Sequence, residues 1–176
     1  EIHLFDGDIF NSHNAFRSPG APSLDEVNAK EAKTDYFARK YDPMHRGIVS
    51  RPVFLDQHNL HELSGFSFVF VCVDKDDARA RIVRFLVDQR IPFVDVGMNL
   101  KIVTKSNSLI GTARTTLVTP KRPETANECI PMGGDDDDAL YRENIQVADM
   151  NAINAALAVI KWKQYLGFYL DQFQSH

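Results

Sequence analysis

The chain has 176 residues, of which 44% are hydrophobic, and 20 Lys and Arg stand against 24 Asp and Glu. Residues 124–143 contain seven acidic residues and one basic residue, so the total charge of −4 combines a local charge of −6 with +2 elsewhere. This balance excludes a polybasic nucleic-acid binder, and two cysteines without a Cys-x-x-Cys pair exclude a disulfide framework and a cysteine-rich zinc site. No apolar run reaches the roughly 18 residues of a membrane span, and the first residues lack the basic region of a signal peptide. We therefore expect a cytoplasmic protein.

The first half of the chain alternates apolar runs with helical patterns. Ser23 and Glu26 form a capping-box pattern ahead of apolar positions, which predicts the start of a helix. Pro52 favours a position at a sheet edge, because proline lacks a ladder donor. The expected elements are a strand at 2–5, a loop at 9–23, a helix at 24–41, an extended segment at 48–55 and a short helix at 56–63.

The second half continues the alternation and ends in a long Ala-rich helix. The expected elements are a strand at 66–73, a helix at 76–90, a strand at 91–96 ending in an Asp-Val-Gly corner, a hairpin of 101–104 and 109–118, an acidic connection at 119–143 and a helix at 144–166 capped by Gly167. This order predicts an α/β fold: a Rossmann-like, doubly wound, mostly parallel sheet with an appended antiparallel hairpin and a long C-terminal helix.

Two predicted strands end in a carboxylate, Asp6 after 2–5 and Asp74 after 66–73. Ligands of open α/β sheets bind at the carboxyl ends of strands, and a carboxylate there accepts hydrogen bonds from ribose hydroxyls. Such a carboxylate normally follows a Gly-rich phosphate loop by ~20 residues, yet no Gly-x-Gly-x-x-Gly occurs in this sequence. Either the fold is different, or a first strand and its glycine loop lie upstream.

The residues around these carboxylates resemble those of the ThiF/MoeB/ubiquitin-activating-enzyme family. Asp6-Gly7-Asp8-Ile9-Phe10-Asn11-Ser12-His13-Asn14-Ala15-Phe16-Arg17 is similar to its Asp-x-Asp-x-Val-x-x-x-Asn-Leu-x-Arg signature. Further similarities follow in the same order at Lys33, Val71–Asp74, Ile91–Gly97, Gly111–Arg114 and the last helix. The resemblance covers nearly the whole chain, and it implies one nucleotide-binding domain over 1–176 that lacks the N-terminal strand and glycine loop, with 119–143 as a flexible connection.

The resemblance implies an adenylyltransferase that uses ATP and Mg²⁺ to activate the C-terminal carboxylate of a ubiquitin-like or sulfur-carrier protein, and a homodimer. No nucleic acid or membrane is expected as a partner. Because a carboxylate is ionised at pH 7, its attack on the α-phosphate needs no general base. Catalysis then depends on orienting the attack and neutralising phosphate charge. The isolated chain is expected to show no ATP–pyrophosphate exchange, while a version extended upstream does.

The resemblance also assigns roles to individual residues. Asp6 and Asp8 belong to the ribose and nucleotide end, and Asn14 holds the turn that carries Arg17. Arg17 and Lys33 meet the phosphates, the first as a planar fork and the second as a point charge. Asp74 binds Mg²⁺, which prefers one or two carboxylates together with phosphate oxygens.

Other cysteine, aspartate and histidine residues are candidates for a reactive thiol or a metal site. Relatives that form a thioester or persulfide use a cysteine in the region of Cys129, but its acidic neighbours disfavour a thiolate. Asp135–Asp138 lack EF-hand spacing and are typical of a solvated loop. His58 and His61 lack a third metal ligand and are expected at the surface.

Three hypotheses for function remain open. The first is the adenylyltransferase, and the second is a catalytically silent dimerisation or docking module of the same fold. The third is an NAD-binding domain. Asp6 fits that hypothesis, but it does not explain why Arg17, Lys33 and Asp74 occur where they do. Calorimetry with ATP–Mg²⁺ against NAD separates the first from the third.

Overall fold

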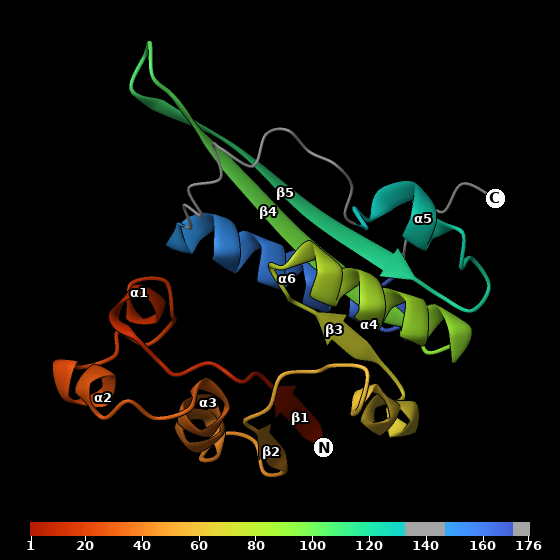
Figure 1. Cartoon of the computed structure of the whole chain (residues 1–176), viewed down its shortest axis with the longest axis horizontal. Helices are drawn as coiled ribbons and strands as arrows, with labels where there is room; N and C mark the ends of the chain where they lie inside the picture. The colour runs from red at the N-terminus through yellow and green to blue at the C-terminus, as the bar shows by residue number, and fades with distance from the viewer. Residues whose placement is uncertain (133–146, 171–176) are drawn as a thin grey trace. The chain divides into compact units, whose positions relative to one another are not determined.

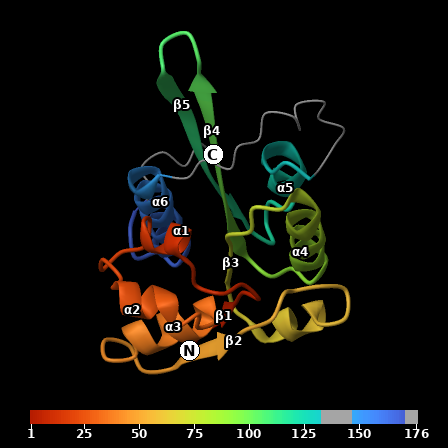
Figure 2. The same ribbon diagram turned by 60° about the vertical axis from the view of Figure 1, so that its left-hand side comes forward.

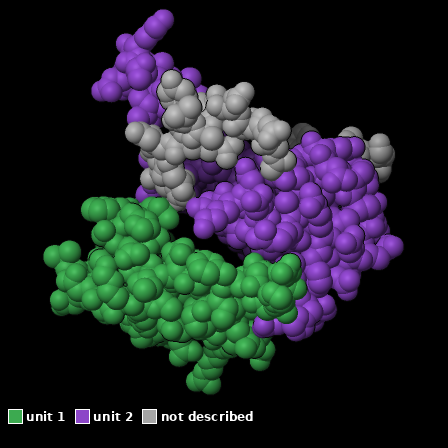
Figure 3. All heavy atoms as spheres, viewed as in Figure 1, with its two compact units in different colours: residues 1–59 green, residues 60–176 purple. Residues whose placement is uncertain are grey.

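The computed structural model describes residues 1–132 and 147–170. They fall into two compact units, Glu1–Asn59 and Leu60–His176, which Figure 3 shows in different colours. Each unit contains its own sheet, and each is described by itself. Among the described helices, none combines the length and the apolarity that a membrane span requires.

The first unit is built on a pair of parallel strands covered by α3. Its elements are β1 (Ile2–Phe5), α1 (Ser12–Ala15), α2 (Leu24–Asn28), α3 (Lys33–Tyr41) and β2 (Ile48–Arg51). The strands pair from Ile2 opposite Ile48 to Phe5 opposite Arg51. The Phe10 ring stacks on the Tyr36 ring at 3.9 Å, and both side chains are buried. This aromatic pair is the centre of the core of this unit.

The helix expected at 24–41 is wrong, because the structure has two helices there and a further short one, α1, in the expected loop. The predicted capping box does exist, since Ser23 Oγ accepts the Glu26 N–H and the Glu26 carboxylate accepts the Ser23 N–H. The chain then leaves the helix at Lys30, whose φ is +51°. Residues 31–33 bond to 8–10 instead: Phe10 N–H donates to the Glu31 carbonyl and Lys33 N–H to the Asp8 carbonyl.

The second unit contains a three-stranded sheet in the order β3-β4-β5 with helices on both faces (Figures 1 and 2). Its elements are a 3-10 helix η1 (Leu60–Gly65), β3 (Val69–Val71), α4 (Asp76–Asp88), β4 (Phe93–Val103), β5 (Ser108–Val118), α5 (Thr125–Cys129) and α6 (Ala148–Tyr165). β3 and β4 run parallel, as expected for two strands joined by a helix, and β4 and β5 form the predicted antiparallel hairpin. The α/β fold with an appended hairpin and a C-terminal helix is confirmed.

Three boundaries in this unit differ from expectation. The strand expected to end at the Asp-Val-Gly corner instead continues through Gly97 to Val103, because β5 pairs with it along its whole length. β3 is shorter than the apolar run 66–73. The connection expected at 119–143 contains α5, and the residues from 133 to 146, which include Asp135–Asp138, lie outside the described part of the chain.

Helix α6 lies on one face of the hairpin, opposite α4 (Figure 2). Asn154 is buried there and joins both strands: its amide donates to the Gly97 carbonyl at 3.0 Å and its amide oxygen accepts from Thr115 Oγ1 at 2.6 Å. The helix ends as predicted at Gly167, whose φ of +75° suits a left-handed cap.

Candidate functional site

The carboxyl end of β1 carries the first candidate residues. Asp6 ends the strand, and its Oδ1 accepts the Asp8 N–H at 2.8 Å, which closes a tight turn over Gly7. A Cβ at Gly7 would lie 2.5 Å from the ring of Phe54, so glycine lets that ring lie against the turn. The backbone therefore holds both carboxylates at one point beyond the strand.

Lys33 joins the two carboxylates. It is the first residue of α3, and its Nζ lies 3.0 Å from Asp6 Oδ2 and 2.8 Å from Asp8 Oδ2. Burial works to lower the pKa of Lys33, but hydrogen bonds to Asp8 and Asp6 outweigh it and raise the pKa above its usual value. The structure thus brings together three of the residues that the sequence assigned to a nucleotide, in a cluster with a formal charge of −1.

Helix α1 positions Arg17. Asn14 is buried and its Oδ1 accepts the Asn11 N–H at 2.9 Å, while the carbonyl of Asn14 accepts the Arg17 N–H and the Ser18 hydroxyl. Asn14 holds the turn, as expected. The Arg17 side chain is partly buried, and it forms no hydrogen bond or ion pair with any residue that the structure describes. No residue in the described part of the chain therefore occupies the donors of this guanidinium.

Asp74 belongs to the second unit, where it follows β3 and precedes α4. It is exposed, and the preceding carbonyl, that of Val73, accepts a hydrogen bond from Arg79 Nη2 at 2.6 Å. The structure thus places Asp74 at the carboxyl end of a parallel strand, as the sequence predicted. Its role as a magnesium ligand stays a prediction. Among the described residues there is no group of three or more His, Cys, Asp or Glu placed to hold a metal ion, and His58 and His61 are exposed as expected.

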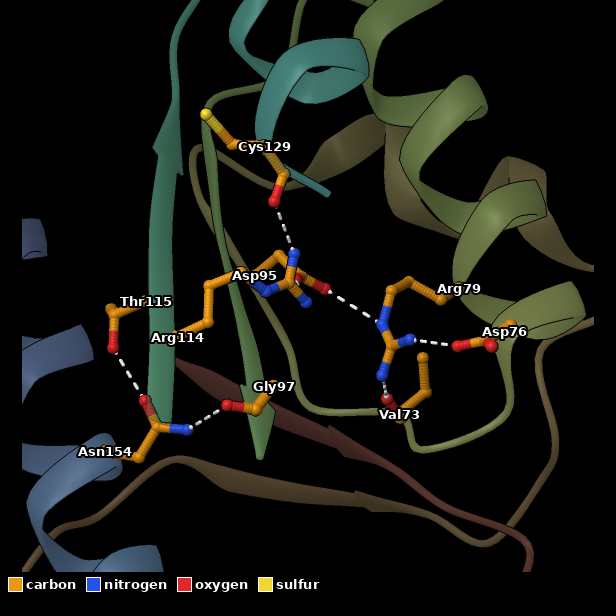
Figure 4. Close-up of polar contacts among 9 residues, drawn as sticks. All are labelled: Val73, Asp76, Arg79, Asp95, Gly97, Arg114, Thr115, Cys129 and Asn154. Carbon is orange, nitrogen blue, oxygen red and sulfur yellow. Dashed lines mark hydrogen bonds and ion pairs between the residues drawn. The ribbon is translucent and has the colours of Figure 1, made fainter. Parts of the chain in front are cut away.

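The most buried charge of the second unit is Asp95, which the sequence analysis did not single out. It lies on β4 with no exposed surface, between Arg79 of α4 and Arg114 of β5 (Figure 4). Arg79 Nε lies 3.3 Å from its Oδ1 and Arg114 Nη2 lies 2.7 Å from its Oδ2. Burial raises the pKa of Asp95, and the two guanidiniums oppose that shift. The only signal in the sequence is an aspartate in the middle of an apolar strand.

Cys129 is the last residue of α5 and is exposed. Its carbonyl accepts a hydrogen bond from Arg114 Nη1 at 2.8 Å (Figure 4). The backbone at this cysteine is therefore tied to the Asp95 network, while the thiol has no hydrogen bond with any described residue.

Comparison with solved structures identifies the architecture. E. coli MccB with succinimide superposes with a TM-score of 0.64 at 16% identity, over 98% of this chain and 50% of that one. MccB with ATP superposes with a TM-score of 0.62 at 16% sequence identity, over 98% of this chain and 49% of that one. This chain has the MccB fold.

Two further comparisons bear on this fold. MccB, a microcin C7 biosynthetic enzyme, has also been solved in complex with N-formylated MccA, and that structure gives a TM-score of 0.62 at 17% identity over 98% of this chain and 51% of that one. PaaA superposes with a TM-score of 0.59 at 16% sequence identity, over 96% of this chain and 57% of that one. The chain thus spans about half the length of the MccB structures it matches. No protein-family model and no curated protein sequence matches it.

Proposed function

We propose that this chain is part of an enzyme that uses ATP to adenylate the C-terminal carboxylate of a peptide or small protein. The observation that carries the proposal is the MccB fold together with the cluster at the end of β1. MccB has been solved with ATP and with N-formylated MccA, which supports a nucleotide and a peptide as ligands of this fold. A ubiquitin-like or sulfur-carrier protein is the substrate class that the motif resemblance favours, and a homodimer is the assembly it implies.

The residues of the first unit suit different parts of a nucleotide. Asp6 and Asp8 only accept hydrogen bonds, so they suit ribose hydroxyls and would repel a phosphate. Lys33 donates to both carboxylates, and because its ammonium has three N–H donors, a third remains for a phosphate oxygen. None of the residues that the structure describes occupies the five donors of Arg17, and its planar fork matches phosphate oxygens. We assign Arg17 and Lys33 to the phosphates, and Asp6 and Asp8 to the ribose end of the nucleotide.

Asp74 suits a magnesium ion that also binds phosphate oxygens, because Mg²⁺ is usually held by one or two carboxylates plus substrate. Asp74 is an exposed carboxylate on a backbone that Arg79 fixes, which satisfies that requirement. The ion would neutralise charge on the phosphates. In the reaction, a carboxylate oxygen of the substrate bonds to the α-phosphorus as the bond to the β-phosphate breaks, and pyrophosphate leaves. Cys129, as an exposed thiol, is then a candidate acceptor of the acyl group: its sulfur would bond to the acyl carbon as the bond to AMP breaks, AMP would leave, and the thiol proton would pass to solvent.

Calorimetry with ATP–Mg²⁺ and with NAD tests the proposal. We expect saturable binding of ATP–Mg²⁺ and none of NAD at the same concentration. Preferential binding of NAD would support the dinucleotide-binding hypothesis instead. ATP–pyrophosphate exchange, measured on this chain and on a version extended upstream, then separates a catalytic domain from a silent docking module of the same fold.

A further inference from the structure

Asp95 connects three segments of the second unit that lie apart in the sequence. Its carboxylate is completely buried on β4, and a guanidinium lies on each side of it, one from α4 and one from β5 (Figure 4). A buried carboxylate is retained only when it is paired, because its desolvation otherwise costs several kcal/mol. An apolar residue would fill the same space without that penalty. The carboxylate therefore serves the two arginines.

The first arginine holds the turn between β3 and α4. Arg79 is buried, and besides its ion pair with Asp95 it donates from Nη2 to the Val73 carbonyl and from Nη1 to Asp76. These acceptors lie on both sides of Asp74, so a single guanidinium holds the backbone carbonyl before this residue and the Asp76 side chain after it. Its position also depends on Asp95, the carboxylate on β4 with which it forms an ion pair.

The second arginine crosses β4 to reach the end of α5. Arg114 lies opposite Gly97 in the hairpin, and a Cβ at Gly97 would lie 2.6 Å from Arg114 Nη2. The glycine therefore leaves the space through which the guanidinium reaches Asp95. From there, Arg114 Nη1 donates to the carbonyl of Cys129, a helix-terminal acceptor that has no partner within the helix.

We infer that Asp95 is a positioning residue: it orients Arg79 and Arg114, and through them it fixes the turn that carries Asp74 and the end of α5 at Cys129. The roles of Asp74 and Cys129 rest on the proposed function, whereas the anchoring of the two segments does not. Without the carboxylate, Arg79 would keep its ion pair with Asp76 but lose its partner on β4, and Arg114 would lose the carboxylate beside which its guanidinium lies. The two guanidiniums would also repel each other, so each would be held less firmly at its backbone acceptor.

Hydrogen exchange measured segment by segment tests this anchoring in three variants. Asp95→Asn keeps the shape of the side chain and removes its charge, so we expect exchange in both the first turn of α4 and in α5 to become about tenfold faster, because both ion pairs of the carboxylate are lost. Arg79→Gln should accelerate only the first turn of α4, and Arg114→Gln only α5.

Matched controls use exposed basic residues of the same regions, Arg84→Gln on α4 and Lys121→Gln before α5, and should leave both segments unchanged. Circular dichroism establishes that each variant is folded, and where Asp95→Asn is not, the two arginine variants carry the test. The inference is overturned if Asp95→Asn leaves both segments at wild-type rates, or if either arginine variant accelerates both segments equally.

A second measurement links this anchoring to the proposed function. In ATP titrations at increasing Mg²⁺, Asp95→Asn and Arg79→Gln should raise the half-maximal Mg²⁺ concentration about tenfold, whereas Arg114→Gln should leave it unchanged. If the wild-type chain binds no ATP, the proposed function fails, and the exchange pattern still decides whether Asp95 anchors the two segments. Equal Mg²⁺ midpoints in all variants that bind ATP would contradict the link between Asp95 and Asp74.

Discussion

Lys33 Nζ lies 3.0 Å from Asp6 Oδ2 although 27 residues separate the two in the chain. The contact exists because the residues before α3 bond to the segment after β1, which ends the preceding helix early. The same bonds bring Lys33 within 2.8 Å of Asp8. The backbone bonds between 31–33 and 8–10, which separate α2 from α3, thus assemble the charged cluster at the end of β1.

The first prediction concerns the stability of this cluster in alkaline solution. Because its folded-state pKa is raised above the usual 10.5, Lys33 contributes stability that is fully present below that pH and is lost as pH rises through the folded-state pKa. Lys33→Met should therefore be less stable than the wild type by about 1 kcal/mol near neutral pH. Thermal unfolding measured from pH 7 to 11.5 should show that the stability difference between the wild type and Lys33→Met shrinks only above pH 10.5. The control is Lys105→Met, at an exposed position between β4 and β5, and a constant difference in the free energy of unfolding across this range would contradict the assignment.

Gly7 should tolerate a side chain only if the ring of Phe54 moves. In Gly7→Ala the new methyl group would overlap this ring, and because the ring is 61% exposed and can turn toward solvent, we expect a loss of about 1 kcal/mol in the free energy of unfolding. Urea denaturation measures this loss. In a protein that already carries Phe54→Ala, adding Gly7→Ala should cost little free energy of unfolding, because the ring is no longer there to clash. If Gly7→Ala costs as much in that background as in the wild type, the clash is not the cause.

Asn154 should be the main polar anchor of α6. Asn154→Ala leaves the Gly97 carbonyl and the Thr115 hydroxyl without their partner, which predicts a destabilisation of about 1–3 kcal/mol. A double-mutant cycle with Thr115→Val should give a coupling energy of about 1 kcal/mol. Asn127→Ala, at an exposed position of α5, is the control and should be near neutral. Additive effects of the Asn154 and Thr115 variants would show that their hydrogen bond does not contribute.

Arg17 should contribute to nucleotide affinity without contributing to stability. Since its guanidinium has no partner among the described residues, Arg17→Met should leave the unfolding temperature unchanged and weaken ATP binding about tenfold, as for loss of a charge-assisted hydrogen bond. Arg17→Lys should recover only part of the affinity, because an ammonium lacks the planar fork. Arg46→Met, an exposed arginine of the same unit, is the matched control. Equal affinities for the Arg17 and Arg46 variants would remove Arg17 from the proposed site.

Much of the fold could be predicted because its signals are short-range. The apolar runs gave β1 and the hairpin, and the capping pattern at Ser23 gave the start of α2. The lengths of the elements were predicted less well. The pattern at 24–41 suits a helix throughout, and no local signal shows that residues 31–33 bond to residues 8–10 instead. Likewise, Gly97 suggests a strand end until the pairing with β5 is known.

The candidate site divides in the same way. The sequence alone determined which residue types stand at the strand ends, because a strand that ends in Asp6 or Asp74 is visible in the order of apolar and acidic residues. Only the tertiary structure decided that Lys33 is shared between two carboxylates, that Arg17 is not paired within the described residues, and that Asp95 joins Arg79 to Arg114. The physical reason is that periodicity and capping act within a few residues, whereas the partner of a charge depends on which distant segments the folded backbone brings within about 3 Å.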